Sequence, residues 1–437
     1  MSRIFLAIAA LLAFSLPARA AVDIQEVTSP GGIKAWLVEE RSIPFMALEL
    51  RFRGGASLDA PGKRGAINLM TGLIEEGAGD LDARGFAAAQ EALAASYGFD
   101  VYDDALSISA RFLSENRDEA VALLRSALIE PRFDQDAVDR VRGQVLAGLR
   151  GDEKDPDEIA SLTFDSMAFG NHPYGSSISG TTDSVTALTR DDIVAAHRAV
   201  LTRDNLYVGA VGDISAEELG LLLDSLLGDL PQSGAPAPER AEFGLTGGIT
   251  VVPFDTPQSV AVFGQAGMDR DDEDFFAAFV MNTILGAGGF DSRLMEEVRE
   301  KRGLTYGVSS YLVPKDYGNL FAGRVASAND RIAEAIEVIK AEWVKIAQEG
   351  VTAEELELAQ TYLTGAYPLR FDGNANIARI MVGMQMTGLP VDYIATRNDK
   401  VRAVTLEDVK RVAARLVDPE GLTFVVVGQP VGLDSTN

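Results

Sequence analysis

Cysteine is absent from this 437-residue chain, and histidine occurs only twice. Without cysteine there can be no disulfide, no thiolate zinc site and no cysteine nucleophile. Basic residues are also scarce, because 39 Lys and Arg stand against 65 Asp and Glu, which gives a formal net charge of −26. This balance argues against nucleic acid or anionic lipid as a ligand, and it would favour basic peptides if the charge lined a cavity. A solvated acidic surface is the simpler interpretation.

Long uninterrupted apolar segments are missing after residue 20. Residues 1–20 combine an early arginine, an apolar run from Ile4 to Leu16 and a small-x-small site that ends at Ala20. This pattern is typical of a secretory signal peptide, whereas a membrane anchor fits less well because the run is short for a span. We therefore expect a mature protein without a membrane anchor, most simply in a bacterial periplasm.

A long internal repeat organises the rest of the chain. Three pairs of segments recur with the same offset of 216 residues: GGI at 31–33 and 247–249, TRDDI at 189–193 with TLEDV at 405–409, and the glycine-ended apolar runs 206–212 and 422–428. The second pair predicts helices capped by Thr189 and Thr405. A repeat on this scale indicates a duplicated domain, because solenoid repeats have periods of roughly 20–50 residues.

Each copy alternates strand-like runs with long helical patterns, so we predict an α+β fold made of two homologous α+β domains. Helices are expected over 115–128 and 138–150 in the first copy, and over 330–349 and 353–366 in the second. A segment rich in proline and small residues, 230–244, predicts a linker. It separates an N-terminal domain over 21–229 from a C-terminal domain over 245–437.

The most distinctive stretch of the second copy is GAGGFDSRLMEEVREKRGLTYGVSSY at 286–311. It predicts a glycine loop, a short helix that is capped by Asp291 or Ser292 and ends at Gly303, and a strand over 304–313. The loop is not a phosphate loop, because no Lys-Ser/Thr follows it.

Arg299 would then lie near the end of this helix and Tyr306 on the strand, so that both side chains could reach one place. From spacing alone, a surface arginine and a half-buried tyrosine are the simpler interpretation. Elsewhere, Glu75 and Glu76 do not form a catalytic pair, because neighbouring helical residues point about 100° apart. His172, before a proline, and His197, on an amphipathic helix, are interpreted as structural.

LMEEVREKRGLTYGVSS at 294–310 resembles the C-terminal-half signature of the insulinase (pitrilysin, inverzincin) family of zinc peptidases. Further matches follow in order along the chain: PGKRG at 61–65, NHPYG at 171–175 and LRFD at 369–372. The resemblance implies that the two domains form half of a clamshell. It also implies that Arg299 and Tyr306 bind substrate opposite a zinc ion.

The zinc motif of that family is degenerate here. Family peptidases carry H-x-x-E-H on the helix after the PGKxG-like turn, because histidines at i and i+4 share one helix face and the glutamate serves as general base. The corresponding positions are Asn68, Thr71 and Gly72, and none of them can do that work. The family's third ligand, a glutamate, would fall at about Ala147 or Gly148.

We therefore interpret the chain as the non-zinc subunit of a heterodimeric zinc metallopeptidase that is inactive alone. The resemblance implies that a zinc-bearing homologous subunit supplies metal, water and base, while this chain, with no cofactor of its own, binds peptide through Arg299 and Tyr306. The substrate would add as a strand to a sheet edge. A non-catalytic scaffold or core subunit of an assembly, and a peptide-binding protein acting alone, remain alternatives. Retention of both residues favours the first interpretation over the scaffold.

Overall fold

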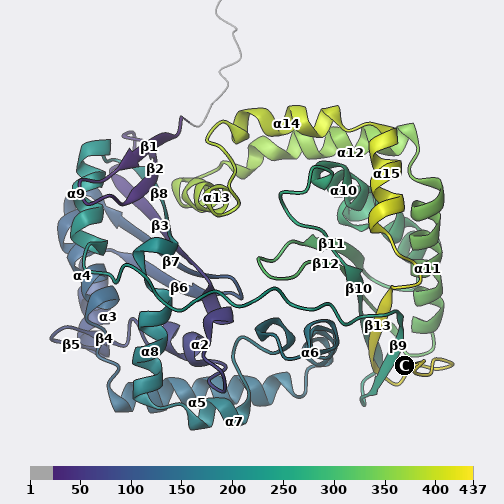
Figure 1. The fold of residues 1–437 in the computed structure, drawn as a ribbon, viewed down its shortest axis with the longest axis horizontal. Helices are drawn as coiled ribbons and strands as arrows, with labels where there is room; N and C mark the ends of the chain where they lie inside the picture. The colour runs from purple at the N-terminus through teal and green to yellow at the C-terminus, as the bar shows by residue number, and fades with distance from the viewer. Residues whose placement is uncertain (1–22, 437) are drawn as a thin grey trace, which may run out of the picture.

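A computed structural model describes residues 23–436, so the predicted signal peptide lies outside the described residues. The chain forms two large mixed sheets, one at each side of the molecule, with helices around them (Figure 1). A small third sheet contains β4 Gly77–Ala78 and β5 Leu81–Asp82. The strands of the first sheet are β1 Gln25–Thr28, β2 Lys34–Glu39, β3 Phe45–Arg53, β6 Ser96–Val101, β7 Ala105–Leu113 and β8 Leu206–Gly212. Those of the second are β9 Gly248–Pro253, β10 Gln258–Ala266, β11 Val308–Val313, β12 Leu320–Ala328 and β13 Thr423–Gly428.

The helices of the two halves follow a similar order. The α-helices of the first half are α2 Ala66–Thr71, α3 Ala83–Ala92, α4 Arg117–Ile129, α5 Gln135–Asp152, α6 Pro156–Phe169, α7 Thr182–Ala187, α8 Arg190–Val200 and α9 Ala216–Leu227. Those of the second are α10 Phe275–Asn282, α11 Ile332–Glu349, α12 Ala353–Ala366, α13 Asn374–Met386, α14 Tyr393–Ala403 and α15 Leu406–Leu416. The four long helices predicted from the sequence correspond to α4, α5, α11 and α12, with α12 matching at both ends.

The two sheets share one topology. Their strand orders are β1-β2-β8-β3-β7-β6 and β11-β12-β10-β13-β9, so the second order, read backwards, repeats the first without β1. In each sheet the strand after the double glycine pairs in parallel with the last strand of its half, and the other pairs are antiparallel. The predicted duplicated α+β fold is therefore confirmed.

The repeated threonines cap their helices as predicted. The Oγ1 atom of Thr189 accepts a hydrogen bond from the backbone N–H of Asp192 at 3.3 Å, and Thr405 accepts one from Asp408 at 3.1 Å. Each aspartate side chain in turn accepts a hydrogen bond from the threonine backbone N–H, which completes a capping box.

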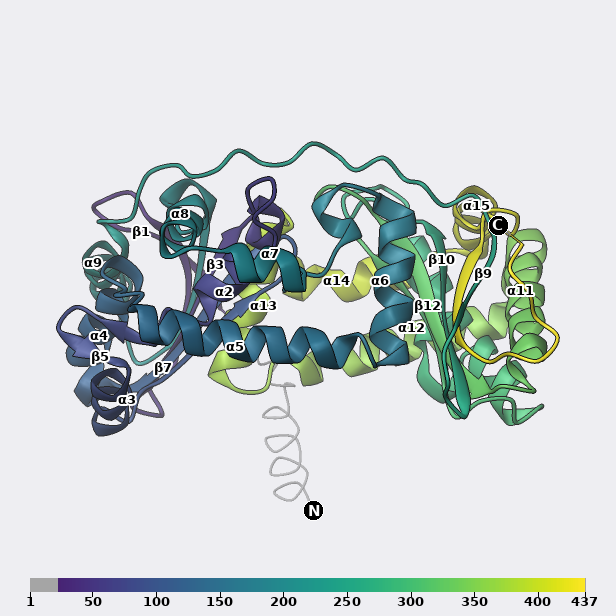
Figure 2. The same cartoon turned by 90° about the horizontal axis from the view of Figure 1, so that it is seen from below.

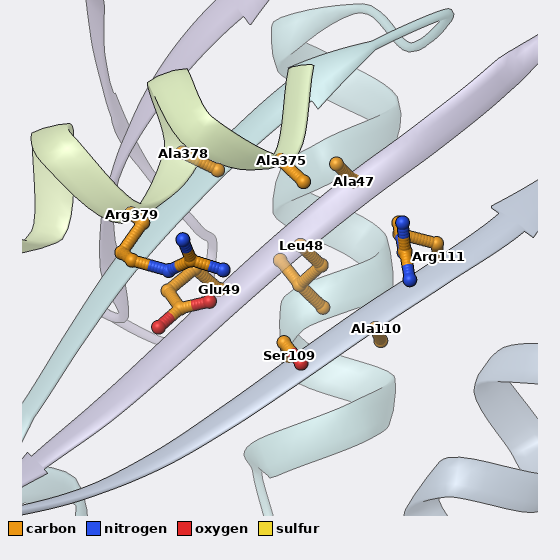
Figure 3. Close-up of a pocket in the computed structure, with 9 residues that line it drawn as sticks. All are labelled: Ala47, Leu48, Glu49, Ser109, Ala110, Arg111, Ala375, Ala378 and Arg379. Carbon is orange, nitrogen blue, oxygen red and sulfur yellow. The ribbon is translucent and has the colours of Figure 1, made fainter. Parts of the chain in front are cut away.

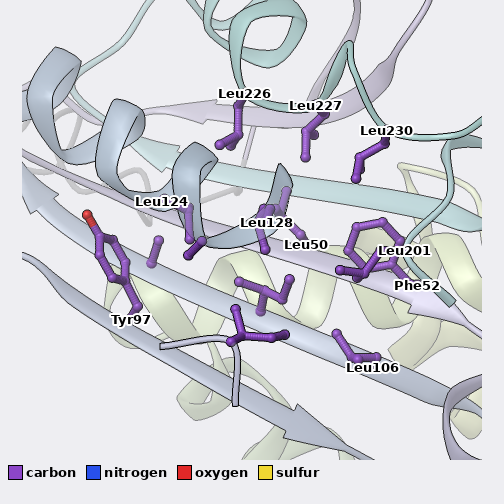
Figure 4. Packing of buried hydrophobic residues seen from close by; sticks show 14 of the residues in the cluster. Leu50, Phe52, Tyr97, Leu106, Leu124, Leu128, Leu201, Leu226, Leu227 and Leu230 are labelled. Atoms are coloured by element: carbon purple, nitrogen blue, oxygen red, sulfur yellow. The ribbon is translucent and has the colours of Figure 1, made fainter. Parts of the chain in front are cut away.

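The core of the first half lies between its sheet and its own helices. Alternate residues of β3, including Leu50 and Phe52, are fully buried and pack against leucines of α4 and α9 (Figure 4). Tyr97 of β6 reaches the edge of this core, and its hydroxyl donates a 2.7 Å hydrogen bond to the carbonyl of Ala120. The buried hydroxyl therefore keeps a partner.

Each sheet buries its second face under a helix of the other half. Helix α13 lies across β8 and β3, while α6 lies across β10 and β13 (Figure 1). Gly209 of β8 permits this packing, because a Cβ there would come within 2.6 Å of the carbonyl oxygen of Ala378. The side chain of Gln385 also donates a 2.8 Å hydrogen bond to the carbonyl of Val208. Each packing unit therefore contains segments from both halves of the sequence.

The segment between α9 and β9 contains no helix or strand and runs extended across the molecule (Figure 2). The Ala235 N–H donates to the carbonyl of Ala199 at 3.0 Å, which holds the segment to α8. Further along, the Ala241 N–H donates to Tyr317 at 2.7 Å, next to the second sheet. Both halves thus hold it by backbone bonds.

No helix of the described residues is long and apolar enough to cross a membrane.

Candidate functional site

Tyr306 lies in a bend that precedes β11, and not on a strand as predicted. The strand begins at Val308, four residues after the expected start at Leu304. The hydroxyl of Thr305 takes part in hydrogen bonds to the carbonyls of Ala326 at 2.6 Å and Gly307 at 2.9 Å. The Thr305 side chain therefore takes the Ala326 carbonyl as its hydrogen-bond acceptor in place of a backbone N–H. The backbone before Val308 consequently does not pair with the neighbouring strand.

Arg299 lies on a π-helical segment, Met295–Glu300, where a short α-helix was expected. The predicted cap is also absent, since the Ser292 hydroxyl donates to the carbonyl of Gly289 at 2.8 Å instead of accepting from the helix. The helical segment ends at Glu300, three residues before the expected end at Gly303. The φ of Gly303 is 58° and its N–H donates to the Arg299 carbonyl at 2.7 Å. π-Helical turns are rare and occur frequently at functional sites.

The side chains of Tyr306 and Arg299 differ in how much of each is exposed to solvent. Tyr306 is 86% exposed, so the expectation of a half-buried tyrosine is wrong. The Arg299 side chain is 32% exposed and its Nε lies 3.3 Å from a carboxylate oxygen of Glu300. Both residues flank one short connection. Within it, the Leu304 N–H donates a hydrogen bond of 2.9 Å to the carbonyl of Val298.

The glycine loop before this helix serves close packing. Gly286 lies within a second π-helical segment, Thr283–Ala287, and a Cβ at Gly286 would collide with Ser310 of β11. Beside this contact, the Ser310 hydroxyl donates to Asn282 Oδ1 at 2.6 Å, and both side chains are buried. The packing holds β11, which begins two residues after Tyr306, against α10.

The positions that correspond to the zinc motif lie on α2 and its C-terminal cap. Thr71 is buried, and its hydroxyl donates to the Ile67 carbonyl at 2.8 Å. Asn68 is half-buried, and a Cβ at Gly72 would lie 3.3 Å from Val141 of α5. The two helices that would carry ligands therefore pack together, yet α5 has no carboxylate at 147 or 148. Within residues 23–436 no group of His, Cys, Asp and Glu could hold a metal ion.

The remaining candidates have structural roles. Glu76 forms a two-pronged ion pair with Arg140, with N–O distances of 2.7 and 2.6 Å, and it is therefore not simply solvated as expected. Burial raises the pKa of the neighbouring Glu75, and the Glu76 charge adds to the effect.

Both histidines bond to backbone groups, as a structural role requires. His172 Nδ1 accepts from the Tyr174 N–H at 3.2 Å, while its Nε2 lies 3.2 Å from the carbonyl oxygen of Glu239. His197 Nε2 lies 2.9 Å from the Leu128 carbonyl. Burial lowers the pKa of both imidazoles, so the neutral forms that make these contacts are favoured.

A polar contact joins the two halves of the chain. Its residues form no recognisable sequence motif, and the sequence did not predict it. Lys315, in the β11–β12 turn, forms a 2.7 Å ion pair with Asp103 in the β6–β7 turn. The Asp316 N–H donates to Asp104 at 3.0 Å, and the hydroxyl of Tyr174 donates to the same carboxylate. This cluster ties the β6–β7 turn of the first sheet to the β11–β12 turn of the second, at the site of the PYG segment.

A cavity of about 650 Å³ lies between the start of α2, helix α8 and the linker. Small apolar residues, among them Ala195 and Pro236, line most of it, and the 2.9 Å ion pair of Lys63 with Asp192 contributes polar groups. Asn68, Thr71 and Gly72 are not among its lining residues. The cavity is therefore separate from the degenerate motif.

Comparisons with known proteins agree with this geometry. Residues 36–182 match the family model described as insulinase (peptidase family M16), and residues 187–363 match the model of the peptidase M16 inactive domain. A non-peptidase homologue from Helicobacter pylori is 29% identical over 89% of this chain and 90% of its own length. An uncharacterised zinc protease of Streptomyces coelicolor is 26% identical over 89% of this chain and 86% of its own.

A solved structure is also similar. The crystal structure of a peptidase M16 inactive domain from Pseudomonas fluorescens superposes with a TM-score of 0.88, at 29% identity, and covers 94% of this chain and 99% of that one. Neither comparison supplies a partner or a substrate. Both agree with the fold described above.

Proposed function

Since the chain belongs to the insulinase family, peptidase family M16, and lacks the family's zinc ligands, we propose that it is the non-zinc subunit of a heterodimeric zinc metallopeptidase. In this proposal a homologous subunit with H-x-x-E-H supplies the metal, the attacking water and the general base. This chain binds the peptide and completes the site with Arg299 and Tyr306.

The observation that carries the proposal is the exposure of Tyr306. An aromatic side chain that is 86% exposed buries almost none of its apolar surface, although hydrogen bonds of Thr305 hold the bend that presents it. A fixed loop that displays an amphipathic ring and hydroxyl suits recognition. The Tyr306 hydroxyl can donate to a carbonyl oxygen of the bound peptide, and the guanidinium of Arg299 can offset negative charge that develops there.

Sheet edges offer the means of holding the peptide. β6 and β11 are edge strands of the two sheets. β11 begins two residues after Tyr306, and its Tyr311 side chain is 40% exposed. An extended substrate added along such an edge would gain backbone hydrogen bonds that do not depend on sequence.

A non-catalytic role is the second candidate, and the relative described as a non-peptidase homologue favours it. A scaffold, or a binding protein acting alone, needs neither a guanidinium nor a hydroxyl aimed at a scissile bond. The two proposals therefore differ in what substitution of Arg299 and Tyr306 should do once a partner is present.

Co-expression with each H-x-x-E-H homologue of the same genome tests the proposal. We expect one homologue to co-elute with this chain in size-exclusion chromatography, and the complex to cleave peptides that neither chain cleaves alone. An obligate interface typically buries upwards of roughly 2,000 Å². A complex with such an interface should stay together during gel filtration and elute earlier than either chain. A chain that elutes unchanged with every such homologue contradicts the heterodimer.

We also propose export to the periplasm, supported by the signal-like pattern of residues 1–20. Mass spectrometry of the native protein should find a mature chain that begins at Ala21. A cytoplasmic chain that still begins at Met1 would exclude this.

A further inference from the structure

A small cavity of about 110 Å³ lies where the two halves meet on the first sheet. Its floor comes from β3 and β7, with Glu49 and Ser109, and its cover comes from α13 of the second half (Figure 3). Alanines at four lining positions leave the space open: Ala47, Ala110, Ala375 and Ala378.

Two arginines border this cavity from different elements. Arg111 projects from β7 and Arg379 from α13, with Leu48 and Glu49 drawn between them (Figure 3). Neither guanidinium forms a hydrogen bond or ion pair with another of the residues 23–436. Burial raises the pKa of the Glu49 carboxyl and the charge of Arg379 acts to lower it, so among the described residues Arg111 is the arginine of this cavity without an acidic partner.

The buried carboxylate of the cavity is already balanced. Glu49 Oε1 lies 3.2 Å from a guanidinium nitrogen of Arg51, and Arg51 Nε donates to Ser107 Oγ at 2.9 Å. The charges of Arg379 and Asp100 also act on Glu49, so the two carboxylates and the three arginines around the cavity, Arg51, Arg111 and Arg379, leave one positive charge.

The start of α13 adds to the positive character. This 13-residue helix has no acidic residue in its first turn and no side-chain cap, and Ala375 in that turn lines the cavity. The N-terminal end of a helix carries partial positive charge.

We propose that this cavity binds the C-terminal carboxylate of a peptide, held between Arg111 and Arg379. Arginine suits the task, because its planar fork matches the two oxygens of a carboxylate. A cavity of about 110 Å³ suits a small group such as a carboxylate with one short side chain. Its alanine walls fit a short apolar side chain.

The position of the cavity connects it with the proposed peptide site, and the choice of a peptide rests on that proposed function. Ser109 pairs with Gly98 of β6, so the floor lies one strand in from the free edge. Neighbouring strands are about 4.8 Å apart, so a peptide added along β6 would lie about 10 Å from β7. About three extended residues span that distance, and the end of the peptide can therefore turn into the cavity.

Calorimetric titration of the isolated chain with two short probes tests this inference. Acetyl-trialanine with a free C-terminal carboxylate should bind, and its C-terminal amide should bind at least about tenfold more weakly, because charge-assisted hydrogen bonds are lost. Arg111→Gln and Arg379→Gln should each reduce binding of the acid at least about tenfold, while Arg111→Lys should give an intermediate loss.

Arg84→Gln is the matched control, since Arg84 is exposed on α3 and the substitution removes the same charge away from the cavity. It should leave binding unchanged, and all variants should keep the wild-type thermal midpoint.

Three results would overturn the inference: equal binding of acid and amide, no binding of either probe, or binding of acetate or phosphate as tight as that of the tripeptide acid. Equal binding of acid and amide would still support a peptide site. Because no zinc-bearing subunit is present in this titration, its failure leaves the heterodimer to be decided by co-expression alone.

Discussion

Lys315 and Asp103, which are 212 positions apart in the chain, form an ion pair of 2.7 Å that joins the turns of the two sheets. Their side chains are 17% and 23% exposed, so solvent screens the pair only in part. Lys315 Nζ also lies 4.3 Å from the ring centroid of Tyr174. The relative orientation of the two sheets depends on contacts of this kind.

Lys315→Met should lower the free energy of unfolding by about 1–3 kcal/mol, because it leaves the partly buried Asp103 with only the longer 3.7 Å contact to Arg64. Urea denaturation at neutral pH measures the change. Lys410→Met, at an exposed position of α15, is the control and should change the stability little. Equal stabilities of the two variants would show that the ion pair contributes nothing.

Asp165 should make the stability depend on pH in a known direction. Burial raises its pKa from 3.8 to about 6, against the opposing effect of Lys315. A raised carboxylate pKa means that the folded state binds the extra proton, so this contribution is full below about pH 4 and is lost as pH rises through 6. Asp165→Asn should therefore be more stable than wild type at pH 7, by about 1–3 kcal/mol.

The measurement is a series of urea titrations of wild type and variant between pH 4 and 7. The advantage of Asp165→Asn should shrink towards pH 4, where the wild-type carboxyl is itself protonated. An advantage that stays constant over this range would assign the effect to packing rather than to ionisation.

Arg299→Ala and Tyr306→Phe should each reduce the turnover of the reconstituted heterodimer at least about tenfold, because one transition-state donor is lost in each. Folding, association and the zinc content of the partner should not change, since Tyr306 is 86% exposed. Tyr362→Phe removes another exposed hydroxyl, on α12, and should leave the rate unchanged. Normal assembly with wild-type cleavage by both site variants would favour the scaffold.

The isolated chain should carry no stoichiometric zinc and hydrolyse no peptide, because Asn68, Thr71 and Gly72 offer no histidine or glutamate. Metal analysis after a chelator wash, with a peptide-cleavage assay on the same sample, checks both statements. About one zinc per chain together with activity would contradict them.

Gly209→Ala should destabilise the protein by about 1–3 kcal/mol, because the new Cβ would meet the backbone of α13 within 2.6 Å and force that helix away from β8. Gly143→Ala is the matched control, since a Cβ there meets nothing within 4 Å on α5 and alanine favours a helix. We expect Gly209→Ala to lower the midpoint of thermal unfolding and Gly143→Ala to raise it. A neutral Gly209→Ala would show that α13 adjusts without cost.

The sequence predicts the duplication and the long helices well, because both depend on local patterns. The Thr189 and Thr405 caps follow from a threonine three residues before an acid, and the structure shows both. The bend at Tyr306 could not be predicted, since it follows from a hydrogen bond between Thr305 and Ala326, a residue of another strand. Helical periodicity likewise shows that a face is buried, but not which sheet buries it.

The placement of α13 imposes an order on biosynthesis. Val211 is buried against Ala378 and Met381, yet β8 is complete at residue 212 and α13 only at residue 386. At about 5–20 residues per second, the ribosome needs roughly 10–35 s to make the intervening chain. Throughout that interval the first sheet presents an uncovered apolar patch, which makes it a natural client for a holding chaperone and leaves any product truncated before α13 prone to aggregate.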